Sequence, residues 1–325
     1  MSRQNISKND SGVAYASYCL IKNYKYSNGF PPSGLYFNKA MSYVHSKIRE
    51  KGRNIMLPHC WYRWGDEVVR YYMPREIVWT HEEAGYTTVD WTGGPPSLGD
   101  DKLMAELEVL TNEFLSKYPV KNNGWYEELL ADHYDGAPFE FQKAYKNCRD
   151  LLFDKTRSND NDVNYANNTL VKVFKTALST FPKDKLFLPV RDFIPAFLKL
   201  ISYPLTGAGE DLFTANDISE EFWYWFSYYL RVHPHAHENI EEETVSYWKS
   251  ELENETRRYY RNFNDHVARL SNKYKEISED GLLVPHLNEG LKRMQDWEES
   301  MKDFDVEGLD DFLADKVILG KSSDS

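Results

Sequence analysis

The sequence predicts a mainly α protein, in which an N-terminal winged-helix-like unit with a β-hairpin precedes a helical C-terminal domain with one long helix. Most segments repeat apolar residues at the three- and four-residue spacing of a helix, whereas two runs near residue 80 alternate as strands do. The 325 residues are enough for two domains of about 100–200 residues each. We expect a winged-helix N-terminal domain over 1–156 and an acidic helical domain over 166–325.

The N-terminal unit begins with an apolar segment, 12–24, that is compatible with a buried helix. Ser33 follows two prolines and can cap a second helix, which Gly52 ends. We interpret 57–74 as a short helix or turn-helix bounded by prolines. The runs 75–81 and 86–92 are rich in β-branched and aromatic residues and flank EEAG, a suitable hairpin loop. Three helical segments before a hairpin is the order of a winged helix.

The rest of the chain is predicted to be helical. A polar run at 157–168, RSNDNDVNYANN, is the expected linker, because Asn, Asp and Ser favour turns. The aromatic run 222–229 predicts a central core helix. The longest helix spans about 239–277; its apolar stripe suits internal packing or a dimeric coiled coil, and interruptions near Glu255 and Asn262 favour internal packing. The other helices are expected near 101–118, 123–134, 138–154, 168–181, 190–203 and 217–231.

Three widely spaced cysteines provide no disulfide framework and no CxxC pair. The first residues contain no apolar stretch of the kind found in signal peptides. The most apolar segment, 186–205, contains charges and three prolines, whereas a membrane span needs about 20 residues almost free of charge. We therefore expect a cytoplasmic protein without membrane contact.

The charge is uneven. The net charge is −12, yet residues 1–75 carry +8 and the remainder −20. In a winged helix, basic side chains hold phosphates while a helix enters the major groove, but basic surfaces also bind acidic protein partners. Acidic residues on the expected wing would repel DNA phosphates and therefore disfavour DNA binding. The candidate residues for binding nucleic acid or a protein partner are Lys39, Lys47, Arg49, Lys51, Arg53, Arg63 and Arg70.

Two short motifs carry a family resemblance. The stretch GLYFNK, ending at Lys39, and the stretch WYRWGDEV, which starts at Trp61, resemble the Panacea domain of prokaryotic antitoxins and phage-associated proteins. Asp66 stands where that family has proline, and the resemblance covers at most 12–150. It implies a non-enzymatic module that recognises a partner protein. Tyr62, Trp64 and Gly65 would then be structural, as an aromatic plug and a sharp turn.

Catalytic signatures are few: the chain has no GxSxG or HExxH, and TGAGED at 206–211 lacks the P-loop lysine. His59 and Cys60 are adjacent, but neighbouring residues rarely point at each other. In HPHAHE, the residues His233, His235 and His237 alternate and are followed by Glu238, so they could share a divalent ion. Pro234, however, places these histidines in a connection between helices, which gives a metal site no rigid support.

These patterns rank three functions. We expect a non-catalytic prokaryotic interaction protein, antitoxin-like or defence-associated, with a protein partner. The alternatives are a winged-helix DNA-binding regulator and a metal-dependent hydrolase built on HPHAHE. We assign no catalytic residue, no cofactor and no metal, and we keep a dimer through the long helix open.

Overall fold

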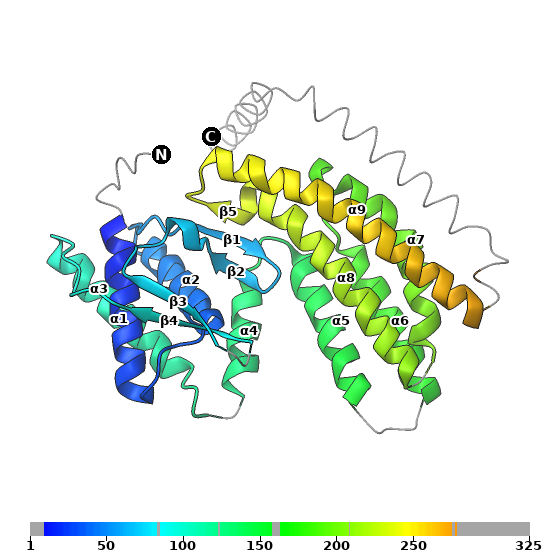
Figure 1. The fold of residues 1–325 in the computed structure, drawn as a ribbon. Helices are drawn as coiled ribbons and strands as arrows, with labels where there is room; N and C mark the ends of the chain where they lie inside the picture. Colours follow the sequence, from blue (N-terminus) through cyan, green and yellow to red (C-terminus); the bar gives the residue numbers. More distant parts are fainter. Residues whose placement is uncertain are drawn as a thin grey trace, which may run out of the picture.

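The computed structural model describes residues 10–274 except 83–84, 123, 158–162 and 208, together with residue 277. It is mainly helical, as the sequence predicts, with two small antiparallel sheets in the described part (Figure 1). The N-terminal helices lie on one side, the later helices on the other, and the strands β1, β2 and β5 lie between them.

The N-terminal unit packs three helices against a β-hairpin. The Ser33 side chain accepts a hydrogen bond from the Tyr36 amide, which confirms the expected cap. The predicted hairpin is also present, with Ile77 opposite Trp91. Its elements are α1 (Asp10–Asn28), α2 (Gly34–Glu50), β3 (Ile77–His81), β4 (Thr87–Trp91) and α3 (Asp101–Lys117).

The segment 57–74 is not the expected helix. It forms a second hairpin, β1 (His59–Tyr62) and β2 (Gly65–Val68), and then a 3-10 turn, η1 (Arg70–Tyr72). Gly65 takes a φ of +88° at the turn, a conformation that glycine adopts at little cost. The third helical segment expected before the β3–β4 hairpin is therefore a pair of strands with a 3-10 turn.

A third strand joins this hairpin from far along the chain. β5 (His237–Glu238) pairs antiparallel with β1, so the sheet order is β2-β1-β5. His59 lies opposite Glu238, and Cys60 lies opposite His237. This small sheet brings the connection between two late helices against the N-terminal unit.

The later part of the described chain is helical. It consists of α4 (Trp125–Asp135), α5 (Glu140–Arg157), α6 (Val163–Ser179), η2 (Lys185–Phe187), α7 (Leu188–Leu205), α8 (Glu210–Val232), η3 (Pro234–Ala236) and α9 (Glu242–Lys273). The expected linker is in part helical, since α6 already starts at Val163, and 158–162 lies outside the described residues.

The buried apolar residues form two clusters. One extends from Val13 to Leu129, and the other runs from Tyr134 to Ile277 but also contains Cys60 and Trp61 of β1. The change between clusters falls before α5, because α5 packs on α6 and α8; the expected division into domains at 156–166 stays a prediction. The β1–β2 hairpin therefore contributes to both cores.

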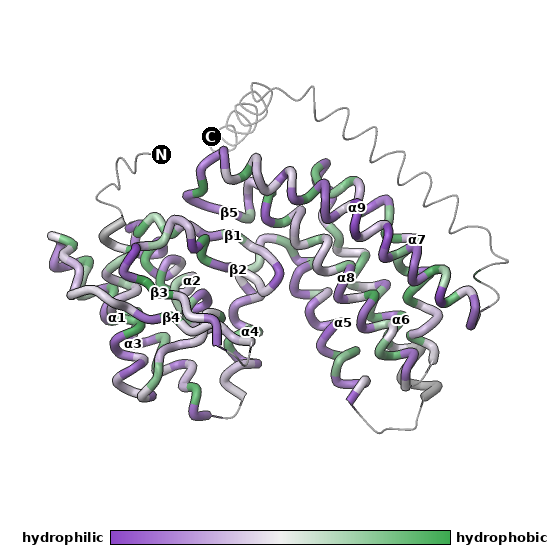
Figure 2. Tube along the Cα trace, viewed as in Figure 1, coloured by the Kyte–Doolittle hydropathy of each residue, from purple (hydrophilic) through white to green (hydrophobic). Residues whose placement is uncertain are grey.

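Aromatic rings fill the second core. Trp225 of α8 stacks on Tyr259 of α9 with centroids 4.3 Å apart, and both are buried. The stripe of α9 thus packs inside the chain, as expected, and the run at 222–229 is the predicted core helix. No helix in the described part is long and apolar enough to cross a membrane, and none is uniformly hydrophobic in Figure 2.

We predict that Gly65→Ala destabilises the fold more than Gly52→Ala does. Both glycines have positive φ, but a Cβ at Gly65 would lie 2.8 Å from His133 Nε2 and 2.8 Å from Lys39 Nζ, whereas nothing lies within 4 Å at Gly52. Backbone strain costs about 1–3 kcal/mol at either position, and we expect the clash to add a comparable amount at Gly65 alone. Urea unfolding measures both; equal losses would contradict the clash.

Candidate metal centre

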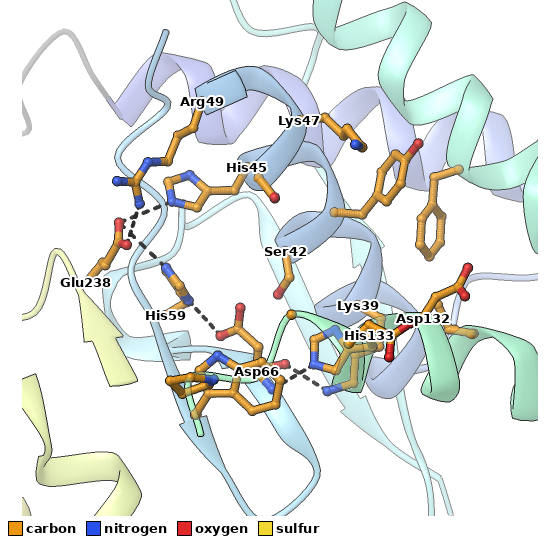
Figure 3. A pocket seen from close by; sticks show the side chains of 18 of the residues that line it. Lys39, Ser42, His45, Lys47, Arg49, His59, Asp66, Asp132, His133 and Glu238 are labelled. Atoms are coloured by element: carbon orange, nitrogen blue, oxygen red, sulfur yellow. Dashed lines mark hydrogen bonds and ion pairs between the residues drawn. The ribbon is translucent and has the colours of Figure 1, made fainter. Parts of the chain in front are cut away.

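A pocket of about 790 Å³ lies between α2, the end of α4, the β1–β2 hairpin and the segment 235–238 (Figure 3). Among the residues that the structure describes, the helices α5 to α9 contribute none to its lining. Its wall instead combines N-terminal elements with the connection between α8 and α9.

His59 is held at this wall by a buried carboxylate. It sits on β1 opposite Val68, and Asp66 lies two residues from Val68 on the same face of β2. His59 Nδ1 is 2.6 Å from Asp66 Oδ1, and both residues are buried. This contact fixes the ring, so His59 Nε2 points away from Asp66 and toward the pocket (Figure 3).

His45 and Glu238 complete the cluster. His45, on α2, places Nε2 3.4 Å from Glu238 Oε2. Glu238 faces His59 across the β1–β5 ladder, with Oε2 3.9 Å from His59 Nε2. Among the described residues His59 Nε2 has no hydrogen-bond partner, although His59 is only 8% exposed. Buried polar atoms normally have a hydrogen-bond partner, whereas this nitrogen has the longer ion-pair contact with Glu238, so it can still bind a further ligand.

The donor set fits a divalent metal ion. His45, His59 and Glu238 each offer one atom, and these atoms lie within 4.8 Å of one another. A tetrahedral ion with bonds of about 2.1 Å separates its ligands by about 3.4 Å, close to the two contacts of Glu238. Two histidines, one glutamate and a free position is a donor set of catalytic zinc sites. The Asp66–His59 contact is the usual support of a ligating histidine.

The centre holds two carboxylates, Asp66 and Glu238, and Glu238 also pairs with the Arg49 guanidinium. Burial disfavours the His59 imidazolium, but Asp66 and Glu238 outweigh it and raise the His59 pKa to about 10. The neighbouring His59 and Arg49 lower the Glu238 pKa to about 2. Burial lowers the pKa of His45, which favours the neutral ring that a metal needs. A proton on His59 and a metal ion would therefore compete for one place.

Lys39 and His133 hold the hairpin that carries Asp66. Lys39 is 1% exposed, and its Nζ donates to the carbonyl oxygens of Trp64 and Asp66. Burial lowers the Lys39 pKa to about 8. His133 Nε2 accepts a hydrogen bond of 2.9 Å from the Asp66 backbone amide, and the His133 ring stacks on Trp61. Lys39, an expected partner-binding residue, therefore supports the hairpin from inside.

Three of the expected binding residues have acidic partners within the chain. Lys47 pairs with Glu50, and Arg49 pairs with Glu238. Arg53 lies 3.2 Å from Asp100 and 3.4 Å from Glu106. Phosphate binding by these side chains would compete with the ion pairs.

The other expected binding residues are spread over different surfaces. Lys51 is exposed after α2, and Arg70 lies over the Trp79 ring. Arg63 lies between the rings of Trp64 and Tyr224, and Trp64 is 49% exposed. Arginine and aromatic side chains are frequent in protein interfaces. The expected protein partner stays a prediction, and its best support is the exposed Trp64 beside the partly exposed Arg63.

The other two residues expected to be structural lie in the β1–β2 hairpin. Tyr62 is half-buried and packs edge-on against Tyr228, while Gly65 makes the hairpin turn.

The three histidines of HPHAHE do not form one ligand set. His233 is buried, stacks on Phe187 and lies 3.4 Å from Asp184. His237 lies beside the Trp248 ring, while His235 lines the pocket. The segment contributes Glu238 instead, and the histidines that meet it come from α2 and β1.

The adjacent Cys60 is no partner for His59. Strand alternation places it on the opposite face of β1, within the second core. Burial raises the pKa of its thiol well above the ordinary value, so the buried thiol is a poor nucleophile.

Comparisons with protein-family models, with curated proteins and with solved structures find no match to this chain. The Panacea resemblance therefore rests on its two motifs alone.

We predict that His133 makes the fold sensitive to acid. Burial, and next the Lys39 charge, lower the His133 pKa to about 3, against an ordinary value of about 6.5. Between these values the unfolded chain binds the extra proton, so His133 contributes stability above pH 6.5 that is lost as pH falls toward 3. In His133→Gln, the pH dependence of unfolding in urea should be shallower by up to about 1.4 kcal/mol per pH unit between pH 6 and 4. Parallel curves would contradict this role.

Proposed function

We propose that this protein is a metal-dependent hydrolase whose divalent ion is held by His45, His59 and Glu238. One observation carries the proposal: the buried His59 Nε2 has no hydrogen-bond partner among the described residues, and its contact at the pocket wall is the long one, 3.9 Å, with the Glu238 carboxylate. This proposal departs from the expectation of a non-catalytic protein, and it moves the metal away from the three histidines of HPHAHE.

The chemistry follows from the open coordination position. A divalent ion held by His45, His59 and Glu238 would supply Lewis-acid chemistry for the hydrolysis of a carbonyl or phosphoryl group near neutral pH. The pocket, at about 790 Å³, lies within the range of about 300–1,000 Å³ that is typical of small-molecule sites.

The ligand types restrict the metal. Imidazole nitrogens suit zinc, iron and cobalt, whereas Mg²⁺ and Ca²⁺ prefer oxygen donors. With two nitrogen ligands and one carboxylate, the site should take Zn²⁺ or Co²⁺ and should not take Mg²⁺.

We predict that the protein binds one Zn²⁺ ion and that His59→Ala abolishes this binding. Asp66→Asn should weaken it about 10–100-fold, because Asp66 orients the ligating ring. His235→Ala is the matched control, since His235 lines the same pocket without belonging to the ligand set. Titration calorimetry against a zinc chelator measures the affinities. Equal zinc uptake by the wild type and His59→Ala would overturn the site.

We also predict metal-dependent hydrolysis. Activated phosphate and carboxylate esters should be cleaved by the zinc-loaded protein, and the activity should be lost with a chelator and restored by Zn²⁺. The comparison is with His59→Ala in the same zinc concentration, after circular dichroism shows that it is folded. If zinc binds one to one but no ester is cleaved faster by the wild type than by this variant, the hydrolase function is rejected while the metal site stands.

A further inference from the structure

We infer that metal binding locks the segment 235–238 and so completes the pocket before substrate enters. The inference rests on the metal site of the proposed function. It adds that the ion is a structural element of the substrate pocket as well as its reactive centre.

The segment 235–238 is the part of the C-terminal half that forms a wall of the pocket. His235, Ala236, His237 and Glu238 line the pocket, whereas the described residues of α8 and α9 on either side do not. If this connection moves away from β1, the pocket opens on that side and Glu238 leaves the two histidines.

The two ends of the connection are anchored on different cores. At one end His233 is buried in the second core, where its ring stacks on Phe187. At the other end the Asn239 side chain donates to the Leu57 carbonyl at 2.9 Å. Asn239 has a φ of 57°, in the left-handed region that asparagine tolerates better than most residues. The wall is thus a short bridge between two fixed points.

Within the bridge Ala236 is buried in the second core and His237 lies beside Trp248, whereas the contacts that hold Glu238 are weak. The ladder of the bridge with β1 has two residue pairs. Glu238 pairs with Arg49, but both side chains are partly exposed, and exposed ion pairs contribute little. The contacts of Glu238 with the histidine nitrogens, at 3.4 and 3.9 Å, are longer than good hydrogen bonds.

A metal ion would replace these long contacts with short bonds. Zinc–nitrogen and zinc–oxygen bonds measure about 2.0–2.2 Å, so the ion would draw Glu238 toward His45 and His59. An ion that needs Glu238 binds the closed form of the wall better than the open form, and therefore shifts the equilibrium toward the closed form.

Hydrogen–deuterium exchange of the full chain tests the inference, with Zn²⁺ alone as the probe. With free zinc at 100 times its dissociation constant, exchange in the peptide covering 233–241 should slow by up to about 100-fold. Peptides within α8 should not change. Glu238→Gln should abolish the slowing, whereas Glu242→Gln, an exposed position in the first turn of α9, should retain it.

The outcomes separate this inference from the proposed function. Stoichiometric zinc binding without slowing at 233–241, or with equal slowing in α8, overturns the inference and leaves the metal site intact. Absence of zinc binding overturns both. The same slowing with Mg²⁺ would show that ionic strength is the cause, and would also overturn the inference.

Discussion

The buried contact between His59 Nδ1 and Asp66 Oδ1, at 2.6 Å, is the interaction on which the rest of the site depends. A carboxylate is expensive to bury unless it is paired and hydrogen-bonded. Asp66 meets this condition through His59, while its backbone is held by Lys39 and His133. Asp66 also fixes the His59 ring, so that Nε2 is directed at the pocket, where it has no hydrogen-bond partner among the described residues and lies 3.9 Å from Glu238.

The position of this pair explains the architecture around it. The β1–β2 hairpin contributes Val68 to the first core and Cys60 and Trp61 to the second. The Trp223 indole also donates to the Arg63 carbonyl at 2.9 Å, which ties α8 to the hairpin. Both cores therefore fix the hairpin, and a rigid support is what a site needs when its ligands must keep their geometry. Glu238 is the one proposed ligand without this rigid support, because it lies on the short connection between α8 and α9.

Local patterns predicted much of the fold. Ser33 follows two prolines and caps α2, and the alternating runs around Gly85 pair as β3 and β4. The β1–β2 hairpin was missed because its strands have four residues each, and aromatic residues with valine suit a buried helix equally well. Gly65, in the middle of that segment, was the available signal of a turn.

The site could not be predicted to the same extent. His45 lies within the apolar stripe of α2, where a core histidine is the ordinary interpretation. The separation of His59 and Asp66 has meaning only once the hairpin is known, because they meet across two strands. Glu238 was noticed beside three histidines, but strand alternation turns it toward His59, a pairing between distant parts of the chain. Long-range pairing of this kind leaves no local pattern.

The most direct test of the account is a crystal structure of the protein soaked with Zn²⁺, with anomalous diffraction recorded at the zinc edge. The account predicts one strong anomalous peak, about 2.0–2.2 Å from His45 Nε2, His59 Nε2 and a carboxylate oxygen of Glu238, with Asp66 still bound to His59 Nδ1. A fully occupied peak elsewhere, for example between His233 and His235, or no peak between these three ligands, would contradict it.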